Sequence, residues 1–283
     1  MALINIEREN FEHHFPGKGF RITHELMDSD LFQLSRLVEL ANNLPSTSIE
    51  HNLGDIPVSL GAADVPKNNL SVADTILQIE NCQSWMVLKN VEQDAVYKEI
   101  LQRCLAEVEP FSTPVVGDML KIEGFIFITS PNSVTPFHFD PEHNFLLQIR
   151  GQKTMSLFDR NDRELLHERW IEDRYSEALT RNLPFDESSQ IKAVEHLLQP
   201  GDGLFVPQNA PHWVKNGNET SISFSITFRS RDSERLSRLY ALNAQLRKIG
   251  LNPSPVMRSP AKDFVKDTLY RAYRKSKSIL NGG

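Results

Sequence analysis

The sequence predicts a mainly β core with helices before and after it along the chain, and two observations support this fold class. Between about residues 111 and 230, short runs rich in β-branched and aromatic residues are separated by Gly, Pro, Asn and Asp, as in strands joined by turns. Before and after this stretch, apolar residues recur every three or four positions, as in helices. Because no long helices separate the strands, we expect a barrel or sandwich rather than a parallel α/β sheet.

The length and composition agree with this organisation. The 283 residues are 40% hydrophobic and 24% charged, which is enough apolar material for a sizeable core and argues against global disorder. We expect residues 1–110 to form a mixed helical region that packs on the core. Residues 111–230 should form the β domain, and residues 231–283 should form C-terminal helices.

The N-terminal region contains five expected elements. Ser29 or Asp30 is a plausible N-cap of the first of its helices. The elements are strands at Phe20–Met27 and Ile56–Leu60, and helices at residues 29–45, 71–85 and 95–111.

The core and the tail contain the remaining elements. Strands are expected at residues 118–130, 144–151, 153–159, 202–207 and 220–230. A stretch dense in both charges, residues 159–190, should be an exposed and partly helical insertion. A helix from Ser233 should stop at Gly250, and after a Pro-rich break a basic helix should cover residues 261–280.

The first chemical signal is a histidine and an aspartate two residues apart, His138 and Asp140. Residues two apart on a strand point to the same face, so their side chains should project together. His212, in "PGDGLFVPQNAPHWVKNG", is the best candidate for a third ligand. Two imidazoles and one carboxylate with open positions form the usual non-haem Fe(II) oxygenase arrangement. His143 should lie on an exposed turn, with no ligand role.

Lys153 adds a second signal, because it shares strand parity with the apolar residues Met155 and Leu157. If this face is buried, the ammonium group needs an anionic partner. A bound dicarboxylate co-substrate would supply one, and the other end of a 2-oxo acid could chelate the iron. The same parity argument makes Phe125 and Phe127 candidate walls of the pocket.

These motifs resemble those of a known family. "SVTPFHFDPEHNFLLQIRGQK" (residues 133–153) and "PGDGLFVPQNAPHWVKNG" (residues 200–217) resemble the JmjC-type, cupin-like 2-oxoglutarate oxygenases. The resemblance is strongest to the protein-hydroxylase branch that contains the asparaginyl hydroxylase called factor inhibiting HIF. That branch shows Thr-Pro-x-His-x-Asp, then Asn, then Gln-Ile-x-Gly-x-Lys, and this sequence has the same residue types in the same order.

The resemblance implies a double-stranded β-helix, also called a jelly-roll or cupin barrel. It places His138, Asp140 and His212 on Fe(II), Thr135 and Lys153 on the distal carboxylate of 2-oxoglutarate, and Asn144 near the co-substrate. Thr227 falls where the family has an amide side chain close to 2-oxoglutarate, which is a departure from the pattern.

The implied activity is hydroxylation of a C–H bond with 2-oxoglutarate and O2 as co-substrates and succinate and CO2 as co-products. The substrate would be a peptide or protein side chain or a small metabolite, and N-demethylation begins with the same hydrogen abstraction. Two other functions are left open: a non-oxidative metal-binding cupin, and a catalytically inactive JmjC-like regulatory or binding protein.

Charge and cysteine content indicate the environment. A net charge of −6 gives no general reason to expect a nucleic-acid partner, although the basic last helix could attract an acidic surface. Only two cysteines, no signal-peptide pattern and no membrane-spanning run together predict a cytoplasmic protein. Helical tails of this branch often dimerise, so a homodimer through the C-terminal helices is one alternative.

Overall fold

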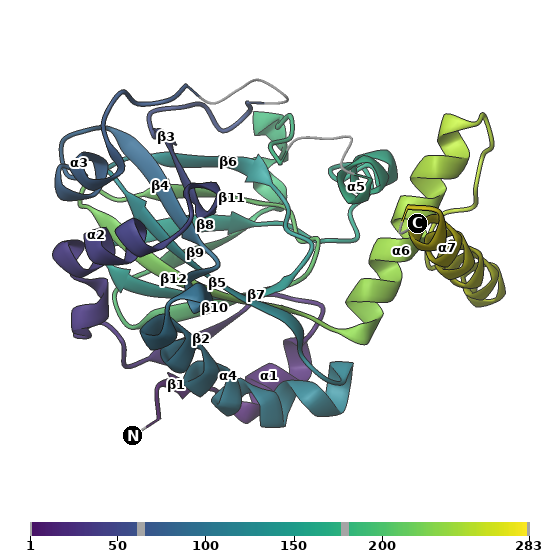
Figure 1. The fold of residues 1–283 in the computed structure, drawn as a ribbon, viewed down its shortest axis with the longest axis horizontal. Coiled ribbons are helices and arrows are strands. Elements are labelled where there is room, and N and C mark those ends of the chain that lie inside the picture. The colour runs from purple at the N-terminus through teal and green to yellow at the C-terminus, as the bar shows by residue number, and fades with distance from the viewer. Residues whose placement is uncertain (1, 61–65, 177–180, 282–283) are drawn as a thin grey trace.

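Two antiparallel β-sheets form the core of the computed structural model, which describes residues 2–60, 66–176 and 181–281 (Figure 1). The larger sheet has the order β1 (Ile4–Asn5), β2 (Phe20–His24), β10 (Asp202–Val206), β7 (His143–Arg150), β12 (Ser221–Arg229), β5 (Leu120–Thr129), β4 (Ser84–Lys89) and β3 (Ile49–Leu53). The smaller sheet has the order β6 (Val134–His138), β11 (His212–Asn216), β8 (Lys153–Leu157) and β9 (Val194–Leu198). The predicted cupin-type β core with flanking helices is confirmed.

Alternation along the strands gives each sheet an inner and an outer face. The inner faces meet in an apolar cluster that includes Leu146 and Leu204 from the larger sheet and Met155, Leu157 and Val214 from the smaller one. The part of the space between the sheets that this cluster fills is therefore apolar, an environment in which a charged side chain is costly.

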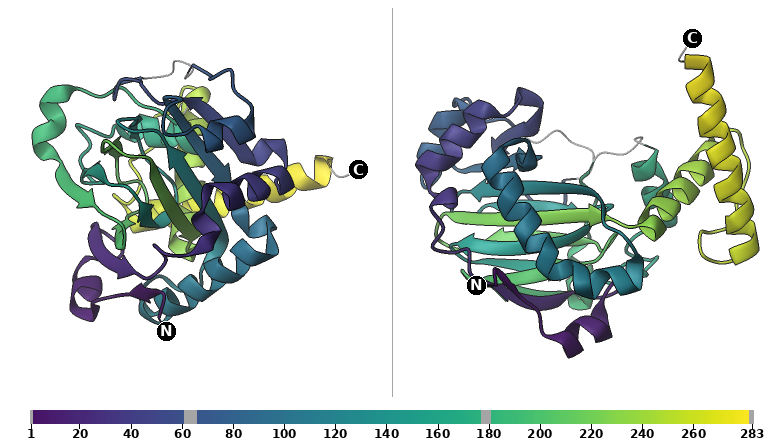
Figure 2. Two further views of the ribbon diagram at one scale, coloured as in Figure 1. Left: turned by 90° about the vertical axis from the view of Figure 1, so that its left-hand side faces the viewer. Right: turned by 60° about the horizontal axis from the view of Figure 1, so that its bottom comes forward.

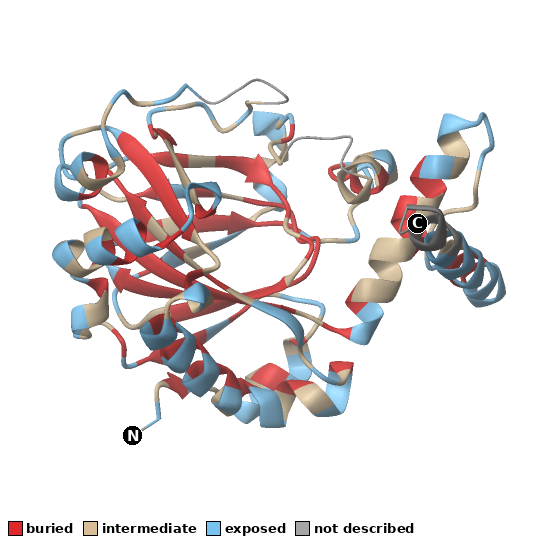
Figure 3. Cartoon of the chain, in the orientation of Figure 1, coloured by how far each residue is buried: buried red, intermediate tan, exposed pale blue. Residues whose placement is uncertain are grey.

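Helices from the first 116 residues cover the outer face of the larger sheet. Leu37 of one helix and Leu101 of another pack there in one cluster with Ile126 and Phe224 of the sheet. Their inward sides are buried and their outward sides exposed (Figure 3). These helices are α1 (Arg8–His14), α2 (Leu34–Asn43), α3 (Val72–Leu77) and α4 (Ala95–Val116), with short 3-10 turns η1 (Asp30–Phe32), η2 (Ser46–Ser48) and η3 (Val91–Gln93).

Two N-terminal expectations were wrong. Ile56–Leu60 forms no strand, because Pro57 lacks an N–H and the segment accepts only scattered hydrogen bonds from the described residues, from Phe137 N–H to the Val58 carbonyl and from Phe185 N–H to the Ser59 hydroxyl. The helix expected over residues 71–85 ends at Leu77, and residues 84–89 form strand β4 instead. Strands β1 to β4, all from the first 110 residues, therefore join the larger sheet.

The charged insertion is less exposed than expected. It contains α5 (Glu168–Tyr175) and the 3-10 turn η4 (Glu187–Lys192), and residues 177–180 lie outside the described part of the chain. Leu166, Ile171 and Leu183 of the insertion are fully buried in a cluster that also holds Phe137 of β6. The apolar residues scattered among the charges thus form a second small core beside the site.

Two helices follow the last strand, as predicted. Helix α6 (Arg231–Lys248) starts at Ser230, whose side chain accepts a hydrogen bond from Ser233 N–H in a capping box. Helix α7 (Pro260–Asn281) packs against α6 and extends away from the sheets (Figure 2).

Candidate metal centre

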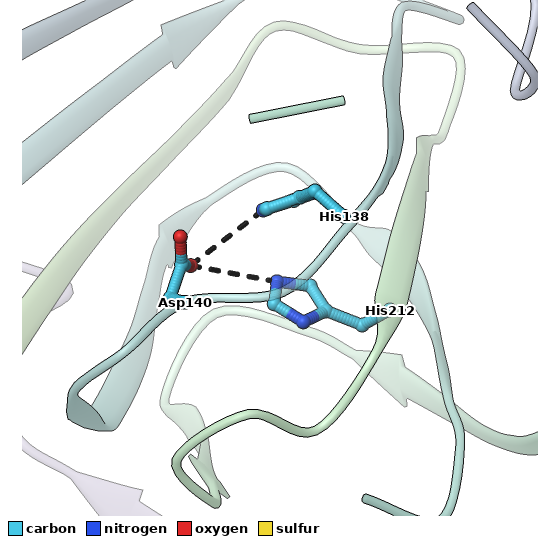
Figure 4. Close-up of side chains that lie close together, drawn as sticks. All are labelled: His138, Asp140 and His212. Carbon is cyan, nitrogen blue, oxygen red and sulfur yellow. Dashed lines mark ion pairs between the residues drawn. The ribbon is translucent and has the colours of Figure 1, made fainter. Parts of the chain in front are cut away.

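The two predicted histidines and the aspartate come together at one end of the smaller sheet. His138 is the last residue of β6 and His212 the first residue of β11, and the two residues are register partners across the antiparallel pair. Asp140 follows the end of β6, and its Oδ2 lies 3.6 Å from Nε2 of His138 and 3.8 Å from Nε2 of His212 (Figure 4). One ligand atom from each residue lies within 4.8 Å of the others.

Backbone carbonyls fix the orientation of both imidazole rings. Nδ1 of His138 is 2.7 Å from the Pro136 carbonyl, and Nδ1 of His212 is 2.9 Å from the Ala210 carbonyl. Because a carbonyl can only accept, each Nδ1 carries the proton and each Nε2 keeps a lone pair directed towards the centre. A hydrogen bond from the other ring nitrogen to a backbone carbonyl is typical of histidines that bind metals.

Electrostatics give the three groups the protonation states that a divalent ion needs. Burial lowers the pKa of His138, with a further contribution from Arg181, and burial together with His138 lowers the pKa of His212 to about 3. Burial alone would raise the pKa of Asp140, but Arg181 and His138 outweigh it and hold that pKa well below its usual range. Two neutral imidazoles and one carboxylate are donors that fit Fe(II).

Arg181 belongs to this centre and was missed from the sequence. Its Nη2 lies 2.6 Å from Nε2 of His138, and its Nε lies 3.5 Å from Oδ1 of Asp140. The segment is held beside β6 by a β-bridge between His138 and Asn182 and by a hydrogen bond from Leu183 N–H to the Phe137 carbonyl. In the sequence, Arg181 is one charge among many in the insertion, so no local pattern distinguishes it.

A cavity adjoins the centre, and four further predicted residues line it. Its lining includes Phe127, Thr135, Asn144 and Lys153 together with the three candidate ligands. Lys153 is only 5% exposed, and burial lowers the pKa of its ammonium group to about 7. Among the described residues, no carboxylate lies within ion-pair distance of its Nζ.

Neighbouring side chains orient the polar walls of this cavity. Trp85 Nε1–H donates to Oγ1 of Thr135 at 3.0 Å, and the Ser225 hydroxyl donates to Oδ1 of Asn144 at 2.6 Å. Trp85 itself lines the cavity and was missed, because residues 84–85 were read as the end of a helix. The run "SWMVLK" of aromatic and branched residues after "NCQ" is a strand signal that could have found it.

A second cavity shares part of this wall. Phe127, Asp140, Asn144 and Arg181 line both cavities. Phe125 and Thr227 line only the second. The Thr227 hydroxyl donates to the Glu123 carbonyl at 3.2 Å.

His143 does not lie on an exposed turn. It is buried at the start of β7, where its ring packs between Phe205 and Phe228, and it is outside the His138–Asp140–His212 group. Its position after Pro141 and Glu142 suggested a turn, but the strand already begins at this residue.

Residues 65–234, more than half of the chain, match the cupin-like domain family, and the chain belongs to that family. Jumonji C proteins are among its relatives. The chain is 33% identical over 101 residues to lysine-specific demethylase 8 of Danio rerio and 32% identical over 101 residues to Jumonji C domain-containing protein 5 of Drosophila melanogaster. Each match covers 34% of this chain and 24% of the relative, so the chain spans about a quarter of these proteins' length.

Solved structures share the fold over nearly the whole chain. One is the ribosomal oxygenase YcfD of Escherichia coli in complex with cobalt and 2-oxoglutarate, with a TM-score of 0.53 and 16% identity over 92% of this chain and 62% of that one. Among the described residues, no helix is both long and apolar enough to cross a membrane.

Proposed function

We propose that this protein is an Fe(II)- and 2-oxoglutarate-dependent oxygenase. The observation that carries the proposal is a buried lysine without an acidic partner in the same cavity as a neutral His–His–carboxylate group. A dianionic 2-oxo acid would provide the counter-charge for Lys153 at one end and a chelating group for the metal at the other. The jumonji relatives and the cobalt and 2-oxoglutarate complex of YcfD support the same assignment.

Each residue then has a defined task. His138, Asp140 and His212 would hold the iron, which supplies the redox chemistry that activates O2. Lys153 and Thr135 would bind the distal carboxylate of 2-oxoglutarate, and the Trp85 N–H keeps the Thr135 hydroxyl hydrogen free to be donated by occupying Oγ1 as an acceptor. Asn144, already fixed by Ser225, would lie beside the co-substrate, and Phe127 would exclude water from it.

We further propose hydroxylation of a peptide or protein side chain or a small metabolite, rather than demethylation. The motif match to the asparaginyl hydroxylase branch supports hydroxylation. The named relatives include both demethylases and a ribosomal oxygenase, so they do not separate the two reactions. A cytoplasmic location also remains a proposal, in keeping with the two free cysteines.

Variants of the candidate ligands test the assignment. Cobalt binding, followed by its visible absorption, should be lost in His212→Ala and Asp140→Ala and retained in His196→Ala, a histidine of β9 outside the group. Wild-type protein with Fe(II), O2 and 2-oxoglutarate should produce succinate, and the two ligand variants should not. Tight metal binding by wild type with no succinate under any of these conditions would favour the non-oxidative cupin.

A homodimer through the C-terminal helices also remains a proposal, but the contact surface is more specific than the sequence suggested. On α6, Leu239 and Tyr240 are buried within the chain. Helix α7 instead buries Asp263 and Asp267 and exposes Phe264, Val265 and Leu269, which are 70%, 55% and 58% exposed. A second copy that packs against this apolar face would cover it.

A further inference from the structure

The second cavity contains charged side chains that the proposed chemistry does not use. Most of its carboxylates already have partners: Glu50 pairs with Lys89 at 2.6 Å, and Glu142 pairs with Arg229 at 2.6 Å. Asp140 belongs to the metal centre. The remaining charged lining consists of Arg174, Arg181 and Glu123.

The two arginines are incompletely satisfied. Arg174 is in the last turn of α5, and its guanidinium makes no ion pair or hydrogen bond with any described residue; its Nε is buried without a hydrogen-bond partner. The Nε of Arg181 is also buried and without a hydrogen-bond partner, and the contacts of that guanidinium are with His138 and Asp140. Both side chains are only partly buried, so each guanidinium presents unpaired N–H donors at the cavity wall. Charged N–H donors of this kind form their strongest hydrogen bonds with anions.

We propose that the second cavity binds the substrate through a carboxylate group held by Arg174 and Arg181. This inference rests on the function proposed above and specifies its substrate class. The planar guanidinium matches a carboxylate with two parallel hydrogen bonds, so two arginines give both affinity and orientation. Because Arg181, Asn144 and Phe127 line both cavities, a substrate anchored here lies directly beside the metal centre.

Glu123 sets a second condition on the substrate. It accepts a hydrogen bond from Asn90 Nδ2 at 3.1 Å but has no cationic partner among the described residues. A donor group near the carboxylate of the substrate, such as an amide N–H or an ammonium group, would satisfy it. An acidic residue within a peptide and a free acidic amino acid both have this chemistry.

The test uses full-length protein loaded anaerobically with Fe(II). Addition of 2-oxoglutarate to one sample establishes whether the charge-transfer band forms, and this reading tests the proposed function alone. A second sample receives N-oxalylglycine, so that the first cavity is filled, and is titrated calorimetrically with N-acetyl-aspartate amide, N-acetyl-asparagine amide, N-acetyl-lysine amide and free aspartate. The capped and free aspartate titrations separate a peptide source from a free amino acid.

We expect at least one aspartate probe to bind roughly tenfold or more tightly than the asparagine and lysine probes. Arg174→Gln should remove this preference, and Arg174→Lys should restore part of it. Arg169→Gln is the matched control, since Arg169 lies on the same helix, pairs with Asp173 and does not line the cavity.

If the charge-transfer band forms, any of the following results would overturn the inference: no binding of either aspartate probe, equal affinity for the aspartate and asparagine probes, or an unchanged preference for aspartate in Arg174→Gln. A fourth is a loss of 2-oxoglutarate affinity in Arg174→Gln without a change in probe binding, which would place the arginine on the co-substrate. Absence of the band would instead contradict the function on which the inference depends.

Discussion

Replacement of Lys153 by methionine should raise the stability of the ligand-free protein and lower its affinity for 2-oxoglutarate. The side chain is 5% exposed in a mostly apolar cavity wall, and burial is the cause that lowers its pKa from 10.5 to about 7. Methionine keeps much of the length and volume of the lysine stem without the charge. Without ligand, the charge only destabilises the fold, and with 2-oxoglutarate it becomes the counter-charge of a carboxylate.

The size of the effect follows from the pKa. Between pH 7 and 10.5 the unfolded chain holds a proton that the folded, ligand-free protein has released, so stability rises as the pH rises through this window. At about 1.4 kcal/mol per pH unit, the cost at pH 7 is about 4 kcal/mol. The ligand-free variant should therefore be more stable than wild type by up to about 4 kcal/mol at pH 7 and by only about 1 kcal/mol at pH 9.5.

Affinity for 2-oxoglutarate should change in the opposite direction. Removal of one partner of a buried charge pair costs about 3–5 kcal/mol, so 2-oxoglutarate should bind roughly 10²- to 10⁴-fold more weakly. Urea unfolding of metal-free protein at both pH values measures the first effect, and anaerobic titration of Fe(II)-loaded protein measures the second. Lys215→Met, at an exposed position of β11, is the control and should change neither. Wild-type 2-oxoglutarate affinity in Lys153→Met, with metal bound, would refute the reasoning.

Three other substitutions test packing and assembly. Burial lowers the pKa of His143 to about 3, so the wild-type protein should lose stability as the pH falls below 6.5. Between pH 7 and 5, the free energy of unfolding of His143→Phe should fall by about 2 kcal/mol less than that of wild type. Equal losses of the two metal-free proteins would contradict this. Arg247→Met should destabilise the protein by about 3 kcal/mol in urea unfolding, because it leaves the buried Glu172 carboxylate without the guanidinium 2.5 Å away. The double variant Arg247→Met/Glu172→Met should recover most of this stability, and no recovery would point to another cause. Leu269→Glu should yield monomers in light scattering at a concentration where wild type is dimeric. The control Thr268→Glu, at an exposed position of the same helix, should weaken the dimer less. A monomeric wild-type protein would contradict the α7 contact.

The sequence predicted best what short-range spacing encodes. Lys153 is buried on the strand face that it shares with Met155 and Leu157, as its parity predicted. His138 is the last residue of β6 and Asp140 lies beyond it, so their closeness in sequence, and not strand parity, keeps the two side chains together. His212 was proposed as the third ligand from its sequence context, and the register of β6 with β11 sets it opposite His138.

The sequence was weakest where long-range packing decides the structure. Arg181 reaches the metal centre because Leu183 is buried beside Phe137, a contact that no local pattern encodes. The first two residues of strand β4, Ser84 and Trp85, were read as the end of a helix, while the pairing of β4 with β3 and β5 decides the structure of this segment. Trp85 was missed as a cavity residue for this reason.

The most direct test of the central claim is anaerobic absorption spectroscopy of the Fe(II)-loaded protein. Addition of 2-oxoglutarate should produce a visible metal-to-ligand charge-transfer band, since chelation requires the His138–Asp140–His212 centre with open positions and Lys153 at the far end of the cavity. The band should be absent without 2-oxoglutarate. Protein that demonstrably holds iron and yet gives no band at saturating 2-oxoglutarate would contradict the oxygenase assignment.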